Sequence, residues 1–319
     1  MSNHTASSAE LTEVYQRLAA HYTALAEKES ARGAAGYARL NKERVQCLRL
    51  LEVCLASRLW QEVNDLAEAI NTYLDQQGYW AENMAVVEMN LNAARQQGAR
   101  RNESMCLNNL GYICGRRGEH EKALMWYEQS LEIDRELEDR QGEGLTLNNI
   151  AEIYQQQGNH KLALKYYEQD LTICRKGGDR KGEGIVLNNI GRLYYEQGDY
   201  ETALTYYNLD ITLQESDKAG AGTSLNNIGE IFRTLNNYTK ALEYHKRALA
   251  TRKEVGDKIG EAESCWNIGL TYYDIDDIAK AEEYISKAVH IEEAVDHPDL
   301  KDDRKALEEV RAERQESSL

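Results

Sequence analysis

Proline and phenylalanine are nearly absent from this 319-residue sequence, which contains one of each, Pro298 and Phe232. Because proline interrupts helices, a chain almost without it can run from helix to helix with few rigid turns. The sequence is rich instead in alanine, leucine, glutamate, glutamine and arginine, which are strong helix formers. We therefore predict an all-α protein.

Positive charge is in deficit: 38 lysines and arginines face 54 aspartates and glutamates, for a net charge of -16. Such a field repels phosphate backbones and anionic lipid, so we expect neither nucleic acid nor a membrane surface as partner. It favours protein or peptide ligands of neutral, basic or mixed character. No apolar run approaches the ~20 residues that span a bilayer, and residues 1–10 lack the apolar stretch of a secretion signal. The predicted location is cytoplasmic.

Patterns for metals, nucleotides and catalysis are also lacking. None of the six cysteines forms a C-x-x-C pair, and none of the seven histidines lies in a metal or triad pattern. Glycine-containing turns such as 178–183 and 256–261 have no strand before them and no Gly-Lys-Ser/Thr after them, as a phosphate loop requires. We expect no cofactor, no metal and no enzyme activity. The cysteines are predicted to be small buried core residues in a reducing compartment.

What the sequence does contain is an internal repeat. An Asn-Asn-Ile-Gly motif, with small variations, recurs at steps of 40, 40, 38 and 40 residues. A glycine or asparagine turn follows each of the first four copies, and an alanine recurs in the second helix of all five units. The five copies begin at Asn108, Asn148, Asn188, Asn226 and Trp266.

Each repeat has the pattern of two helices. Leu147, Ile150 and Tyr154 fall on one helical face, and the Ala163 helix after the turn carries a matching apolar stripe with Tyr167. A small residue in the middle of the first helix allows the second to approach closely. Glycines at the reversals, such as Gly118, are expected in the left-handed conformation that ends a helix.

These residues resemble the tetratricopeptide repeat family, whose pattern of a Leu-Gly pair, an aromatic, a turn, then alanine and an aromatic is matched in five units from about residue 105 to 294. The usual unit has 34 residues. The longer unit is similar to repeats of Pins/LGN polarity scaffolds, kinesin light chains and sensor regions of bacterial signalling ATPases. The closing proline is missing, Cys114 replaces the first aromatic, and Asp170 and Asp210 occupy an alanine position.

The resemblance implies a right-handed superhelical solenoid of antiparallel helix pairs with capping helices at both ends. Because a terminal repeat exposes its stacking face, solenoids need such caps. We expect one continuous solenoid, in which Pro298 starts the last helix. Its predicted segments are a cap at 1–59, a degenerate unit at 60–100, five repeats at 101–140, 141–180, 181–218, 219–258 and 259–297, and a capping helix and tail at 298–319.

The second asparagine of each motif points away from the pair's core, on the face that lines the groove in this family. Asparagine is a mediocre helix former, and its amide complements a peptide group. The resemblance implies that these residues clamp an extended backbone; alternatively, they bond to neighbouring helices and set the stacking. They are Asn109, Asn149, Asn189, Asn227 and Asn267. The residue before each is expected to face the neighbouring repeat.

Specificity is expected from variable residues on the same face. For each of these, an ordinary solvated helix surface is the alternative, and Arg192 and Arg233 have acidic neighbours in Glu152 and Glu230. The set is Met105, Tyr112, Arg116, Glu152, Gln156, Arg192, Tyr195, Glu196, Glu230, Arg233, Trp266, Leu270 and Asp274.

The function that the sequence favours is a scaffold or adaptor that binds a partner segment, an extended peptide, in the groove. Two alternatives stay open: a self-associating scaffold that forms weak homo-oligomers, and an autoinhibited regulatory or sensor subunit of a signalling system.

Overall fold

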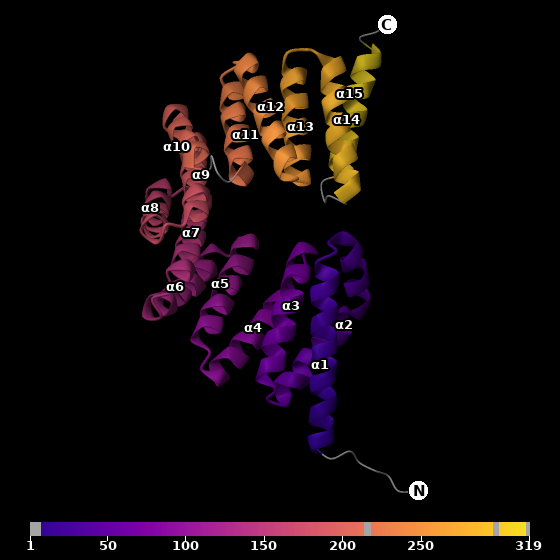
Figure 1. The fold of residues 1–319 in the computed structure, drawn as a ribbon, viewed down its shortest axis with the longest axis vertical. Coiled ribbons are helices and arrows are strands. Elements are labelled where there is room, and N and C mark those ends of the chain that lie inside the picture. Colours follow the sequence, from indigo (N-terminus) through magenta and orange to yellow (C-terminus); the bar gives the residue numbers. More distant parts are fainter. Residues whose placement is uncertain (1–7, 214–217, 296–299, 317–319) are drawn as a thin grey trace. The chain divides into compact units, whose positions relative to one another are not determined.

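The computed structural model describes residues 8–213, 218–295 and 300–316, and over these ranges the chain forms fifteen α-helices and no strand (Figure 1). The predicted all-α fold is confirmed. The chain divides into two compact units, Met1–Asn159 and His160–Leu319.

From residue 8 onward, the described part of the first unit contains seven helices joined by short turns. The predicted N-terminal cap and degenerate repeat correspond to α1 to α4, whose side chains share one apolar core. The helices are α1 (Ser8–Ser30), α2 (Ala34–Ala56), α3 (Trp60–Gln76), α4 (Trp80–Gln97), α5 (Arg100–Arg116), α6 (His120–Glu136) and α7 (Arg140–Gln156).

The second unit contains eight helices in the described residues. Pro298, the predicted start of the last helix, lies outside the described residues; the helix is seen from Leu300. The helices are α8 (His160–Gly177), α9 (Arg180–Glu196), α10 (Tyr200–Leu213), α11 (Lys218–Thr234), α12 (Tyr238–Val255), α13 (Lys258–Asp274), α14 (Ile278–Val295) and α15 (Leu300–Glu316).

The two helices of a repeat meet where the small residue of the first lies under a ring of the second. A Cβ atom added to Gly111 of α5 would lie 2.6 Å from the ring of Tyr127 in α6, and Gly191 and Tyr207 have the same relation in α9 and α10. Tyr127 and Tyr207 are each 2% exposed. The predicted close approach is therefore confirmed.

Ring pairs repeat along the second unit. Tyr194 stacks on Tyr206 with centroids 5.6 Å apart, and Phe232 stacks on Tyr244 at 5.5 Å. Tyr272 and Tyr284 form the third stack at 5.7 Å. On α5 the corresponding position holds Cys114, which is 1% exposed. All six cysteines are free and buried, as predicted.

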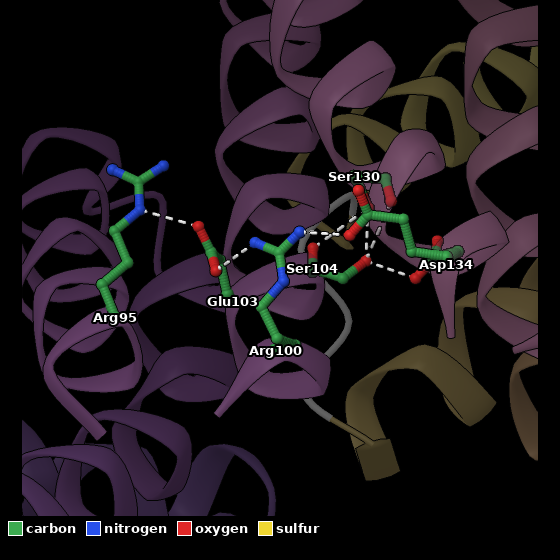
Figure 2. Close-up of polar contacts among 7 residues, drawn as sticks. Arg95, Arg100, Glu103, Ser104, Ser130 and Asp134 are labelled. Atoms are coloured by element: carbon green, nitrogen blue, oxygen red, sulfur yellow. Dashed lines mark hydrogen bonds and ion pairs between the residues drawn. The ribbon is translucent and has the colours of Figure 1, made fainter. Parts of the chain in front are cut away.

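Successive repeats of the first unit are joined by a glutamate held between two arginines. Glu103, near the start of α5, accepts from Arg95 of α4 at 2.8 Å and from Arg100 at 2.7 Å (Figure 2). Glu143 of α7 repeats the arrangement with Arg135 and Arg140 at the same distances. Burial raises the pKa of Glu103, but the arginine hydrogen bonds and charges outweigh it and hold that pKa below its usual value.

Glycines in the left-handed conformation follow the ends of several helices, and aspartate side chains cap the starts of others. The predicted reversal glycine Gly118 has φ 75°, in the left-handed region. Asp139 caps α7 by accepting from the Gly142 amide at 3.2 Å, and Asp179 caps α9 by accepting from Gly182 at 2.9 Å. The glycine-containing turn at 178–183 thus holds a helix cap.

Candidate functional site

In two repeats the first asparagine of the motif forms a hydrogen bond to the next repeat, as expected. Asn108 on α5 is 7% exposed and donates through Nδ2 to Thr146 Oγ1 on α7 at 3.0 Å. Asn188 on α9 donates in the same way to Ser224 Oγ on α11 at 2.7 Å. In both cases the hydroxyl belongs to the next repeat, so these amides stabilise the stacking of first helices.

The second asparagine of the following repeat completes this link. Asn149 Nδ2 donates to Asn108 Oδ1 at 3.0 Å, and Asn227 Nδ2 donates to Asn188 Oδ1 at 3.4 Å. A carboxamide has two N–H groups and a carbonyl oxygen with two lone pairs. One N–H of Asn149 and one of Asn227 therefore serve the stacking, while the rest of each amide retains hydrogen-bonding capacity.

The second asparagine is half-buried in all five copies of the motif. Within the described residues, the side chains of Asn109 and Asn267 form no hydrogen bond with the protein. The arrangement thus combines two roles. Asn149 and Asn227 contribute to stacking, and all five asparagines remain partly exposed.

The predicted specificity residues differ in how far they are already engaged. Arg233 is paired, as its acidic neighbours suggested: it contacts Glu230 at 2.9 Å and Asp274 at 3.0 Å. Arg116 lies over the ring of Trp80, 5.5 Å from its centroid. Tyr112 is 41% exposed. Of the other predicted residues, exposed ones are Gln156, Arg192, Glu196 and Asp274, and half-buried ones are Glu152, Tyr195, Glu230, Trp266 and Leu270.

Two large apolar residues on this face were missed. Leu145 is 57% exposed and Ile185 is 51% exposed, four residues before Asn149 and Asn189 respectively. Met105, four residues before Asn109, is 52% exposed. Residues four apart share a helix face, so the spacing that selected Met105 also selects Leu145 and Ile185. Exposed side chains of this size beside polar amides are suited to a partner surface.

A cavity of about 310 Å³, also unforeseen, lies between α5, α6 and α7. Met105 and Leu145 line its exposed side, and the buried carboxylate of Asp134 on α6 lines its inner side. Asp134 accepts hydrogen bonds from Ser104 and, at 3.1 Å, from Thr146. Figure 2 shows Ser104, Ser130 and Asp134 turned toward one another.

Burial raises the pKa of Asp134, the two hydroxyl hydrogen bonds lower it, and the negative charges of Asp139 and Glu143 raise it; the net direction is upward. Burial also raises the pKa of Asp170 on α8 to about 6. Asp170 accepts from the Cys174 thiol at 3.4 Å. Asp134 lies at the stacking surface between two repeats, where it accepts a hydrogen bond from Thr146 of the next one.

No group of three or more histidine, cysteine, aspartate or glutamate side chains is arranged to hold a metal ion within residues 8–213, 218–295 and 300–316. Across the same ranges, no helix has the length and apolar character needed to cross a membrane.

Comparison with solved structures supports the fold. A signal transduction ATPase with numerous domains and a tetratricopeptide repeat sensor, from Pyrococcus horikoshii, matches with a TM-score of 0.61 and 20% identity over 95% of this chain and 49% of its own. BtubC (BKLC) from P. vanneervenii matches with a TM-score of 0.58 and 21% identity over 68% of this chain and 92% of its own. A Rap protein complexed with competence and sporulation factor matches with a TM-score of 0.57 and 13% identity, covering 97% and 99%.

Comparison by sequence identifies the family. No curated protein matches the chain. The model of the tetratricopeptide repeat matches residues 85–136, 143–215 and 220–293, more than half of the sequence. Proteins of this kind are generally non-catalytic scaffolds for protein interaction. The chain belongs to the tetratricopeptide repeat family.

Proposed function

We propose that this protein is an interaction scaffold that binds an extended segment of a partner protein along the first helices of its repeats. The observation that carries the proposal is the coincidence, on one helix face, of half-buried asparagines with large exposed apolar side chains. In the first unit these are Asn109 and Asn149 beside Met105 and Leu145. The apolar core of the repeat does not need a large apolar residue on that face, and stacking uses only one N–H of the Asn149 amide.

The hydrogen bond between Asn149 and Asn108 orients the Asn149 side chain for peptide binding. Its Nδ2 is turned toward Asn108 of the preceding repeat, which fixes the orientation of the amide plane. The carbonyl oxygen lies on the other side of the same planar group and accepts a hydrogen bond from a peptide N–H. A fixed amide loses less side-chain entropy when it binds than a free one does.

The expected partner is neutral, basic or mixed in charge, because the chain carries a net charge of -16. At about 1 kcal/mol for each hydrogen bond, five asparagines contribute about 5 kcal/mol before ordering costs. Micromolar affinity requires about 8 kcal/mol. Apolar contacts such as those offered by Leu145 supply the remainder, and the interaction is moderate and reversible.

The test is selection of linear peptides from a random library on the purified chain, followed by affinity measurement with two sets of variants. Asn109→Ala and Asn267→Ala remove asparagines whose side chains form no hydrogen bond in the described residues. Asn208→Ala is the matched control, an exposed asparagine on the second helix α10. We expect each of the first two to weaken peptides that contact it by about five- to tenfold.

The control variant is expected to bind all selected peptides as the wild type does. Recovery of no peptide above background, or equal affinity for the wild type and both asparagine variants, would contradict the proposal. Light scattering at several protein concentrations examines the alternative of self-association: a mass that rises with concentration and falls in the Leu145→Glu variant would favour it.

A further inference from the structure

The cavity between α5, α6 and α7 combines an apolar opening with an acidic floor. Met105 and Leu145 are each more than half exposed, whereas Asp134 is 3% exposed. The cavity volume of about 310 Å³ lies at the lower end of the range for small-ligand pockets. It is therefore large enough for one long side chain and too small for a folded element.

The carboxylate on the floor has no basic partner among the described residues. Its hydrogen bonds come from the neutral hydroxyls of Ser104 and Thr146. The one basic residue of the lining, Arg101, contacts Asp139 instead, with Nη2 2.8 Å from Oδ2. Burying a carboxylate costs free energy that a paired cation or several hydrogen bonds offset. Asp134 has hydrogen bonds from two neutral hydroxyls but no cation in the described part of the chain, so the cavity favours a positively charged group beside it.

At another interface between repeats, the position that corresponds to Asp134 also holds a buried charge, and there a second charge neutralises it. Arg252 on α12 occupies the position that corresponds to Asp134, and it is 2% exposed. Its guanidinium contacts Glu263 at 2.8 Å and donates to Ser264, the counterpart of Thr146, at 3.1 Å. There the buried charge is neutralised within the protein. Between α6 and α7, the residue that corresponds to Glu263 is Leu145, and no neutralising charge is present in the described residues.

The rim of the cavity lies beside the asparagines of the proposed peptide-binding surface. Met105 precedes Asn109 by four residues and Leu145 precedes Asn149 by four, so each pair shares a helix face. A segment bound to Asn109 and Asn149 therefore passes the opening. Apolar sides suit the methylene groups of a basic side chain, whose charged end reaches deeper.

We propose that this cavity is a specificity pocket for one lysine or arginine of the bound partner segment, whose cationic group pairs with Asp134. The inference rests on the proposed function for its partner, but the pocket can be probed alone. Of the five methionines in the sequence, Met105 lines the cavity, and Met125 on α6 is 46% exposed and is absent from the lining. Methyl-labelled methionine therefore provides a reporter and an internal control for NMR.

The probes are n-butylguanidinium and n-butylammonium, with n-pentanol as the uncharged comparison. We expect saturable shifts of the Met105 methyl signal with the two cations, no shift of Met125, and at least tenfold weaker binding of pentanol. Asp134→Asn, which keeps the shape of the side chain, is expected to weaken cation binding at least tenfold. The matched control is Asp210→Asn, a buried aspartate that accepts from Ser224 at 2.6 Å in the other unit.

A second variant tests the pocket without changing the buried residue, in case Asp134→Asn impairs folding. Leu145→Lys changes an exposed residue and places a basic side chain at the opening, where it competes with the probes and reduces their affinity. Unchanged cation binding in both Asp134→Asn and Leu145→Lys, or equal binding of pentanol and the cations, would overturn the proposal.

The peptides selected on the wild-type chain separate this inference from the proposed function. In a double-mutant cycle, Asp134→Asn and replacement of a peptide lysine by norleucine are expected to show strong coupling. Peptides that bind without any dependence on a basic residue support the function and overturn the pocket. Cation binding at Met105 without recovery of any peptide supports the pocket and contradicts the function.

Discussion

The side-chain amide of Asn149 donates to the side-chain oxygen of Asn108, 3.0 Å away and one repeat earlier. The first asparagine of one motif and the second asparagine of the next motif thus meet at the junction between two repeats. Asn108 is buried and joins repeats, whereas Asn149 is half-buried and uses part of its amide for the same junction. The pair Asn188 and Asn227 reproduces the relation in the second unit.

Asn108→Ala is expected to lower the free energy of unfolding by about 1 to 3 kcal/mol, because it removes the bonds to Thr146 and Asn149 and leaves buried polar atoms unpaired. Asn109→Ala, one residue along, is expected to change it by less than about 0.5 kcal/mol. Urea-induced unfolding followed by circular dichroism measures both. Equal losses for the two variants would show that the neighbours do not divide their tasks in this way.

Gly111→Ala is expected to destabilise the protein by about 1 to 3 kcal/mol, since the new methyl group would lie 2.6 Å from the Tyr127 ring. Gly177→Ala is the control, because a Cβ there meets no atom within 4 Å. It is expected to be neutral or slightly stabilising. Thermal unfolding compares the two. A Gly111→Ala variant as stable as the wild type would mean that the helices of this repeat do not depend on their close approach.

His245 is expected to make the protein sensitive to mild acid. Burial, and then the charges of Arg233 and Arg252, lower its pKa from 6.5 to about 4. Between these values the unfolded chain binds a proton that the folded chain does not, so stability is full above about pH 6.5 and falls as the pH drops toward 4. His245→Tyr, which installs the residue of three sister repeats, should reduce that fall by up to about 3 kcal/mol.

Urea unfolding at several pH values between 4 and 7 measures this effect. His290→Tyr is the control, because the side chain of His290 is 85% exposed, and it is expected to leave the pH profile unchanged. The prediction is wrong if His245→Tyr and the wild type lose the same stability across this range.

Asp170 is expected to act in the opposite direction over much of the same range. Burial raises its pKa from 3.8 to about 6, so the folded chain keeps a proton that the unfolded chain releases. Its contribution is therefore full below about pH 4 and is lost as the pH rises through 6. Asp170→Asn, uncharged at every pH, should increase stability at pH 7 by at most about 3 kcal/mol.

Unfolding at pH 4 and at pH 7 tests this, with the exposed Asp276→Asn as the control. The gain from Asp170→Asn should be present at pH 7 and small at pH 4. A gain of the same size at both values would exclude titration of Asp170 as its cause.

Much of the site could be predicted because its pattern is local. Helical periodicity predicts that Asn109 and its four counterparts lie opposite the core of their helix pair, and each of them is half-buried. The same rule, applied fully, finds Leu145 and Ile185. Their role in binding stays a prediction. The acidic cavity could not be found in this way, because Asp134 and Asp139 look alike along the chain. Only the fold shows that Asp139 contacts Arg101 while Asp134 lies buried without a basic partner.

The order of residues was sufficient to define the repeat, its two helices, the glycine turns and the apolar stripe of each core, because these depend on interactions within a few turns of the chain. How the repeats recognise one another was decided by three-dimensional packing. The bonds of Asn108 to Asn149 and of Asp134 to Ser104 join residues 41 and 30 positions apart. Whether a polar side chain in this protein can bind a partner depends on whether a side chain of the neighbouring repeat already forms a hydrogen bond with it.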